Sequence, residues 1–220
     1  MLSLGMDIGT STVKLVLLKN QEIEKQWMAV HHGNPFVCLK KALSMLELAM
    51  DTPFSLCVTG SNTEALLEQD SAIPSLGDIP AIVEGVRQIV PQAGSVIEIG
   101  SQGARFITDL QSRAPQFAVN EHCAGGTGSF FEDQMSRVGC KLEDYSSLVE
   151  QAQSIPRLSG RCAVFAKTDI QPLLNQGAHK EDVAASIFQA VVDQTVTGLS
   201  QGRRIEGKVL FLGGPLYYCQ

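Results

Sequence analysis

The sequence has no cluster of lysine or arginine residues and no long apolar run. Its 220 residues include 17 basic and 23 acidic side chains, which gives a net charge of -6. This balance argues against a nucleic-acid-binding surface, because phosphate binding needs clustered cations. No apolar stretch approaches the roughly 18 residues of a membrane-spanning helix. The apolar residues 1–18 are interrupted by Asp7 and Lys14 and lack the flanks of a signal peptide, so we expect a soluble, cytoplasmic protein.

The six cysteines include no CxxC pair, and a cytoplasmic chain is not expected to use them as a disulfide framework. Four of them lie in or beside apolar segments, where a small buried thiol is the expected state. These four are Cys38, Cys57, Cys140 and Cys219. Cys123 and Cys162 differ from them, because each precedes a predicted helix.

One short motif occurs twice, 91 residues apart, as MDIGTSTVKLV from Met6 and as IEIGSQGARFI from Ile97. Acid, glycine and cation recur at matching positions: Asp7 and Glu98, Gly9 and Gly100, Lys14 and Arg105. In both copies an apolar run ends in the acid, passes through a Gly/Ser/Thr turn and resumes as an alternating run. This pattern predicts two strands joined by a tight turn.

Each of these turns carries groups that suit a phosphate. Main-chain N–H groups and hydroxyls can point at phosphate oxygens, and an acid at a strand end can hold a hydrated Mg2+. An ordinary hairpin is the alternative for a single copy. Two copies in one chain predict a duplicated domain that binds a nucleotide between its halves. The length and the repeat spacing favour two α/β lobes, residues 1–94 and 95–220.

Apolar periodicity predicts a similar order of elements in both lobes. In the first lobe we expect strands at 2–8, 12–18, 23–30 and 54–58, the last of them buried, and helices at 39–50 and 79–90. In the second lobe we expect strands at 95–99, 104–110, 114–119 and a buried strand at 209–212, with helices at 127–138, 163–174 and 180–199. Pro172 should disturb the end of its helix. The apolar stripe of 180–199 is interpreted as core packing, and the chain is expected to be a piece of a longer polypeptide.

Together with Gly213-Gly214 after the last strand, the two turns resemble the phosphate-1, phosphate-2 and adenosine motifs of the acetate and sugar kinase, heat-shock protein and actin superfamily. The segments CAGGTGSFFE at 123–132 and CAVFAKTDI at 162–170 resemble those of one branch of it. This branch comprises the activators (component A) of 2-hydroxyacyl-CoA dehydratases and the ATPase subunits of benzoyl-CoA reductases, the BadF/BadG type. The resemblance covers essentially the whole chain. It implies a duplicated actin-like (ribonuclease H-like) α/β ATPase fold with two lobes around a nucleotide cleft.

The resemblance also assigns roles to residues. Asp7 would orient Mg2+ through water, and Asp7, Glu98 and Gln102 are the candidate catalytic residues, with Gln102 positioning a water. The candidate residues for binding ATP or ADP are Gly9, Thr10, Ser11, Thr12, Lys14, Gly100, Ser101, Gly126, Thr127, Gly213 and Gly214. His31 and His32 are expected in a loop and receive no role.

The second turn departs from the family pattern Asp-x-Gly-Gly-Gln-Asp. Glu98 keeps the charge with one extra methylene, Ser101 adds a side chain where the backbone must approach phosphate, and Gly103 replaces an acid. Nucleotide binding is therefore better supported than fast hydrolysis. A turn that binds without catalysing is the alternative.

Cys123 and Cys162 are separated by 38 residues, and a helix N-terminus after each would stabilise an anionic iron–sulfur cluster. Two cysteines cannot complete a four-thiolate site. The resemblance implies a homodimer in which each subunit gives two cysteines to one [4Fe–4S] cluster on the two-fold axis. Two plain thiols are the alternative, and a zinc site is disfavoured because no CxxC pair is present.

Under this resemblance the chain is the ATPase module of an electron-transfer activator. Ferredoxin or flavodoxin would load the cluster, and ATP binding and hydrolysis would move the lobes through the two helices after the cysteines. One low-potential electron would then pass to a partner 2-hydroxyacyl-CoA dehydratase or related CoA-ester reductase. A kinase of the same superfamily and a nucleotide-sensing module without electron transfer are the two alternatives.

Overall fold

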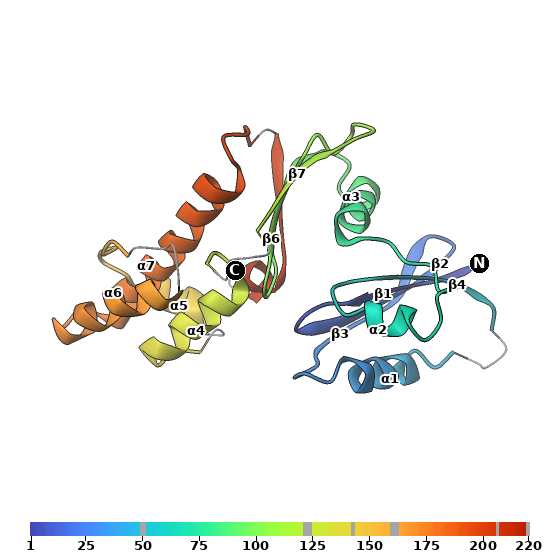
Figure 1. Cartoon of the computed structure of the whole chain (residues 1–220), viewed down its shortest axis with the longest axis horizontal. Coiled ribbons are helices and arrows are strands. Elements are labelled where there is room, and N and C mark those ends of the chain that lie inside the picture. Colours follow the sequence, from blue (N-terminus) through green and yellow to red (C-terminus); the bar gives the residue numbers. More distant parts are fainter. Residues whose placement is uncertain (49–51, 121–124, 142–143, 159–162, 206, 219–220) are drawn as a thin grey trace. The chain divides into compact units, whose positions relative to one another are not determined.

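The computed structural model describes residues 1–48, 52–120, 125–141, 144–158, 163–205 and 207–218. The chain divides into two units, Met1–Gly85 and Val86–Gln220, coloured blue to green and green to red in Figure 1. Their boundary lies inside helix α3 (Asp78–Ile89). Within the described ranges, every helix is too short or too polar to cross a membrane.

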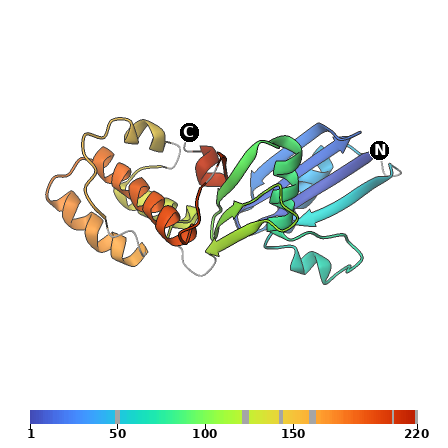
Figure 2. The same ribbon diagram turned by 90° about the horizontal axis from the view of Figure 1, so that it is seen from above.

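The first unit is built on a four-stranded sheet whose strands lie side by side in Figure 2, in the order β3-β2-β1-β4. The strands are β1 (Leu2–Ile8), β2 (Thr12–Lys19), β3 (Glu22–Val30) and β4 (Phe54–Thr59). Strand β1 is antiparallel to β2 and parallel to β4. Helix α1 (Pro35–Met45) packs on one face of this sheet and contributes to its core, and α2 (Glu64–Leu67) follows β4. Alternate strand residues and α1 form the core: Leu4, Met6, Ile8, Val13, Leu15, Leu17, Leu39, Ala42, Leu46 and Val58.

The second unit has a sheet of the same design, in the order β7-β6-β5-β8. Its strands are β5 (Ala93–Ile99), β6 (Ala104–Thr108), β7 (Gln116–Asn120) and β8 (Lys208–Leu212). Its helices are α4 (Gly128–Val138), α5 (Tyr145–Val149), α6 (Ala163–Asn175), α7 (Lys180–Asp193), η2 (Gln194–Leu199) and α8 (Gly214–Tyr218). Sheet and helices share one core, which includes Ile97, Ile99, Phe106, Phe130, Phe131, Met135, Val183, Ile187 and Val191.

The two sheets repeat one another in strand direction and register. Asp7 faces Lys14 across β1 and β2, and Glu98 faces Arg105 across β5 and β6. The offset of 91 residues also holds one strand further on, because Val13 pairs with Ala29 and Ala104 pairs with Asn120. The predicted duplication and the predicted strands of both sheets are therefore confirmed.

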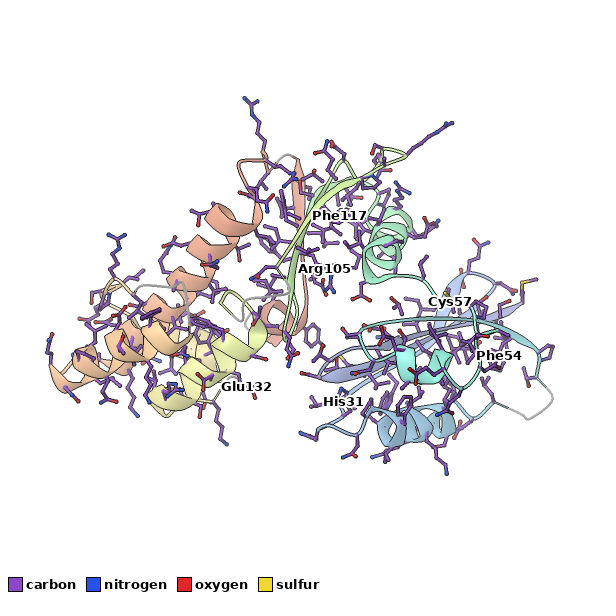
Figure 3. The ribbon with its side chains drawn as sticks, in the orientation of Figure 1. His31, Phe54, Cys57, Arg105, Phe117 and Glu132 are labelled. Atoms are coloured by element: carbon purple, nitrogen blue, oxygen red, sulfur yellow. The ribbon has the colours of Figure 1, made fainter. Side chains whose placement is uncertain are left out.

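Two strands that were predicted to be buried are edge strands. In β4, Phe54 is 43% exposed and Cys57 is exposed (both labelled in Figure 3), and in β8 Phe211 is 58% exposed. Each of these strands has a neighbouring strand on one side only, and on the other side of β4 Val58 alone forms an isolated bridge, with Ser75. The prediction of buried cysteines was therefore wrong for Cys57. Cys38 and Cys140 are half-buried, and Cys219 lies outside the described residues.

Two helices differ from the predicted ranges, and a third contains a proline that was expected to disturb its end. Helix α1 begins at Pro35, because proline suits the first helical turn, and ends at Met45. The helix predicted over 180–199 is α-helical only to Asp193 and continues as the π-helix η2. Its apolar stripe is only partly core, because Phe188 and Val192 are each 36% exposed. At the margin of that stripe, Val196 is 46% exposed. Pro172 lies inside α6, which still continues to Asn175.

Candidate functional site

The first turn joins β1 to β2 and is closed by a hydrogen bond from Gly9 N–H to Thr12 O, 3.0 Å long. At its base, Asp7 Oδ2 accepts from Lys14 Nζ at 2.7 Å, because the two residues face each other across the strands. The Asp7 side chain is 35% exposed and that of Lys14 is 44% exposed. A hydrated cation from solvent can therefore reach the Asp7 carboxylate.

Side chains from two other segments hold the Gly9 carbonyl of this turn. It accepts a hydrogen bond from Asn62 Nδ2 at 2.7 Å and lies 3.1 Å from His31 Nε2. The backbone of both residues is also tied to the turn, because His31 N–H donates to Ser11 O and Asn62 N–H donates to Ile8 O. His31 is only 8% exposed, so the sequence interpretation of it as a loop histidine without a role was incomplete.

The segment after β4 lies directly against the first turn. Gly60 has a φ of +106°, and a Cβ atom there would lie 2.5 Å from Ile8 O and 2.6 Å from Asp7 Oδ1. Asp78, at the start of α3, fixes this segment by accepting hydrogen bonds from Gly60 N–H at 3.0 Å and Thr59 Oγ1 at 3.2 Å. A residue larger than glycine would push the β4 segment away from the turn.

The second turn joins β5 to β6 and is closed by Gly100 N–H donating to Gly103 O at 2.8 Å. Glu98 Oε2 accepts from Arg105 Nη1 at 2.7 Å, with side chains that are only 19% and 12% exposed. The acid of the second turn is therefore more deeply buried than Asp7, and its charge is held against a guanidinium.

Helix α4 begins on this second turn. Gly128 N–H donates to Gly100 O and Ser129 N–H donates to Ser101 O, both at 2.8 Å, and the hydroxyls of Ser101 and Ser129 lie 3.2 Å apart. The first N–H groups of a helix have no intrahelical acceptor, so the turn carbonyls satisfy them. The turn and the helix are thereby one hydrogen-bonded unit.

The other residues of the second unit that the sequence proposed for the site lie in several different segments. Gly213, with a φ of +103°, lies so close to Ile99 O that a Cβ atom would overlap it, and Gly214 begins α8. Gln102 lies exposed in the second turn. Thr127 is fully buried at the start of α4, and Gly126 lies beside Gln194 of η2.

Cys123 and Cys162, the predicted cluster ligands, lie outside the described residues. Helix α6 begins at Ala163, immediately after Cys162, and α4 begins five residues after Cys123, at Gly128. Within the described part of the chain, no group of three or more His, Cys, Asp or Glu side chains is placed to hold a metal ion.

The family model described as the BadF/BadG/BcrA/BcrD ATPase family matches residues 4–217. The chain belongs to this ATPase family. It is 28% identical over 219 residues to the 2-hydroxyisocaproyl-CoA dehydratase activator of Clostridioides difficile, with 97% of this chain and 81% of that protein covered. It is 26% identical over 219 residues to a benzoyl-CoA reductase subunit of Thauera aromatica, with 96% and 77% covered.

Solved structures agree with the family. The activator of the 2-hydroxyisocaproyl-CoA dehydratase from Clostridium difficile with bound ADPNP superposes with a TM-score of 0.88 at 25% identity, covering all (100%) of this chain and 82% of that one. A putative 2-dehydro-3-deoxygalactonokinase from Sinorhizobium meliloti has a TM-score of 0.56 at 11% identity, with 96% and 86% covered, which is a likeness of fold alone. The predicted family and the predicted actin-like α/β fold are confirmed.

Sequence reasoning missed three residues that shape the first turn of this ATPase-family chain: His31, Asn62 and Asp78. Asn62 and Asp78 carry no sequence signal of their own, because their contacts with the turn depend on how β4 packs beside β1. A signal for His31 did exist. The offset of 91 residues matches it with His122, so both halves carry a histidine just after the third strand. His122 lies outside the described residues.

Proposed function

We propose that this family member is an ATP-dependent activator that passes a low-potential electron to a partner 2-hydroxyacyl-CoA dehydratase or related CoA-ester reductase. The observation that carries the proposal is the pair of turns, each with an acid–cation pair at its base, in a chain of an ATPase family. The relatives support the choice of partner, because they are named as a dehydratase activator and as part of a CoA-ester reductase.

The first turn is the better equipped of the two for ATP. Because Gly9 N–H closes the turn, the proposed phosphate donors are the N–H of Thr10 and the hydroxyls of Thr10, Ser11 and Thr12. Asp7 would hold Mg2+ through water, and its 35% exposure is compatible with a hydrated ion. Lys14 would stay paired with Asp7 and add positive charge near the phosphates. In the second unit, Gly100, Ser101, Gly213 and Gly214 are the proposed contacts.

Hydrolysis is proposed to be slow. Gln102 is exposed and available to position a water, but Glu98 is buried against Arg105 and Gly103 offers no carboxylate. The buried Glu98 and the missing carboxylate at Gly103 also favour a second candidate function, a nucleotide-sensing module that binds ATP without fast turnover. The kinase alternative needs a further catalytic carboxylate in the second unit, and the glycine at position 103 does not provide one.

A [4Fe–4S] cluster fits what the described residues show around the two cysteines. Helix α6 starts directly after Cys162, and the positive end of a helix stabilises an anionic thiolate site. Cys123 and Cys162 give two of four thiolates, so a homodimer would complete the site. When bound, the cluster supplies a one-electron carrier. Ferredoxin or flavodoxin is the proposed electron donor.

Anaerobic purification of the wild-type chain tests this function. We expect the purified protein to bind added ADPNP and to hydrolyse ATP slowly. It should contain about four irons per two chains, as one shared cluster requires. Added 2-hydroxyisocaproyl-CoA dehydratase should then oxidise the reduced protein only when ATP is present. ATP binding with neither iron nor turnover would support the sensor instead, and phosphorylation of a sugar would support the kinase.

A further inference from the structure

Two side chains from other segments of the chain hold the carbonyl of Gly9 in the first turn. Asn62 Nδ2, from the segment after β4, donates to it at 2.7 Å. His31 Nε2, from the loop after β3, lies 3.1 Å from the same oxygen. These two side chains come from positions 53 and 22 residues away in the chain, so two separate segments meet at one turn carbonyl.

The second ring nitrogen decides how His31 acts. Gly33 N–H points at His31 Nδ1 at 3.2 Å, so Nδ1 is the acceptor. The proton of a neutral imidazole is then on Nε2, which makes Nε2 a donor to Gly9 O. The tautomer is therefore set by the Gly33 amide, and both side chains donate to the same carbonyl.

Holding this carbonyl fixes the direction of the next amide. The peptide group is planar and trans, so the C=O of Gly9 and the N–H of Thr10 point in opposite directions. A flip of the Gly9–Thr10 peptide would rotate ψ of Gly9, which glycine tolerates widely, together with φ of Thr10, and hydrogen bonds to the Gly9 carbonyl oppose that rotation. A flip would turn a carbonyl oxygen toward the phosphate in place of an N–H group, replacing attraction by repulsion.

The second turn holds the equivalent carbonyl differently. Gly100 O accepts from the main-chain N–H of Gly128 at 2.8 Å, at the start of α4. A main-chain donor is present whatever the side chain, except in proline. The same carbonyl is thus held in both turns, by two side chains in the first turn and, among the residues that the structure describes, by a main-chain N–H group in the second.

We propose that His31 and Asn62 are positioning residues for nucleotide binding, which hold the Gly9 carbonyl so that Thr10 N–H faces the phosphates. The proposal rests on the proposed function, because it needs a phosphate at the first turn. It assigns no contact between either side chain and the nucleotide. Their effect passes entirely through the Gly9–Thr10 peptide.

Paired amide substitutions test the role of His31. Gln places an N–H donor near the position of Nε2, whereas Asn can replace only the Nδ1 acceptor. We expect His31→Gln to bind Mg-ADPNP within about threefold of the wild type, and His31→Asn to bind it about tenfold more weakly, the effect of losing one hydrogen bond. Asn62→Asp, which puts a carboxylate oxygen beside the Gly9 carbonyl, should weaken binding at least as much.

Two controls separate positioning from general damage. His32→Asn makes the same change at the next residue, which is exposed and has a φ of +47° that asparagine accepts, and it should leave affinity unchanged. Adenosine has no phosphate, so its affinity, measured by competition, should be equal in all variants. Thermal unfolding of each variant shows whether it is folded.

The outcomes distinguish this inference from the function on which it rests. Wild type that binds no Mg-ADPNP overturns both. Wild type that binds it while folded His31→Asn and Asn62→Asp bind it equally well overturns the positioning role and leaves the function standing. Equal losses of adenosine and ADPNP affinity also overturn it, because they indicate a structural role. Selective loss of ADPNP affinity with rescue by His31→Gln supports it.

Discussion

Gly60 and Gly213 occupy equivalent places in the two units, each directly after the strand that runs parallel to the acid-bearing strand. Both have positive φ, +106° and +103°, and at both a Cβ atom would run into the carbonyl that follows the acid, Ile8 O in the first unit and Ile99 O in the second. The duplication therefore extends beyond the repeated motif to a pair of glycines that the motif does not contain.

Alanine at either glycine should destabilise the chain and displace the adjacent turn. We expect Gly60→Ala and Gly213→Ala to lower the free energy of unfolding by more than about 3 kcal/mol, from backbone strain plus overlap with the carbonyl. Gly177→Ala is the control, because Gly177 has a φ of +86° with open space around it, so that only about 1–2 kcal/mol of strain applies. Denaturant unfolding measures all three; equal losses would mean that the close approach is unimportant.

The charge of Asp7 should be needed for ATP turnover. Asp7→Asn keeps the shape and the neighbouring strand pairing but removes the anion proposed to hold Mg2+. We expect steady-state hydrolysis of Mg-ATP to fall about a hundredfold or more. Asp70→Asn, an exposed aspartate whose Oδ1 acceptor for Ala72 N–H is preserved, is the matched control. Normal hydrolysis by Asp7→Asn would contradict the nucleotide assignment of the first turn.

Restoring an acid in the second turn should accelerate hydrolysis. Gly103→Asp supplies the carboxylate that the family pattern has at this position, and we expect kcat to rise about tenfold or more. Gly103→Asn has the same size without the charge and should give no such gain. If the wild type already hydrolyses ATP as fast as Gly103→Asp, the second turn is not the reason for slow turnover.

Loss of either proposed cluster cysteine should remove both the bound iron and the dimer. Cys123→Ala and Cys162→Ala are expected to lose the broad absorption near roughly 400 nm and to lower the dimer fraction, because metal binding and assembly are coupled. Cys57→Ala, at an exposed thiol on β4, should keep both. Iron counting and sizing in solution after anaerobic reconstitution check this. Iron content unchanged in both cluster variants would leave the two residues as plain thiols.

Low pH should lower the folding stability of the second unit, because Asp182 becomes protonated. Hydrogen bonds from the Ser154 hydroxyl, the Ser154 N–H and the Gln153 N–H lower the pKa of this carboxyl below its ordinary value. The stability that it contributes is therefore complete above the ordinary aspartate pKa of about 4 and is lost as the pH falls through the lower folded-state pKa. Asp182→Asn should be less stable than wild type at pH 7 and similar to it at strongly acidic pH. Thermal unfolding across this range would show a constant difference if the charge were irrelevant.

The sequence predicted what local patterns determine. Alternating apolar residues and the Gly/Ser/Thr turns located both hairpins, and the repeat located the acids and cations, but it did not show that they pair across the strands. Local patterns do not determine which strand lies at an edge, so the apolar runs of β4 and β8 were wrongly expected to be buried. They also did not reveal the contacts of Asn62 and His31 with Gly9, since these depend on the packing of distant segments.

Helix α4 packs in the core of the second unit through Phe130, Phe131 and Met135, and its first two N–H groups end on the carbonyls of Gly100 and Ser101. A displacement of the second turn of a few tenths of an ångström must either stretch two hydrogen bonds or carry the start of the helix with it. The rigid rod then enlarges a small rotation at Gly128 into a larger excursion at its far end near Val138. A movement of the second turn is therefore transmitted to α4 through its first turn.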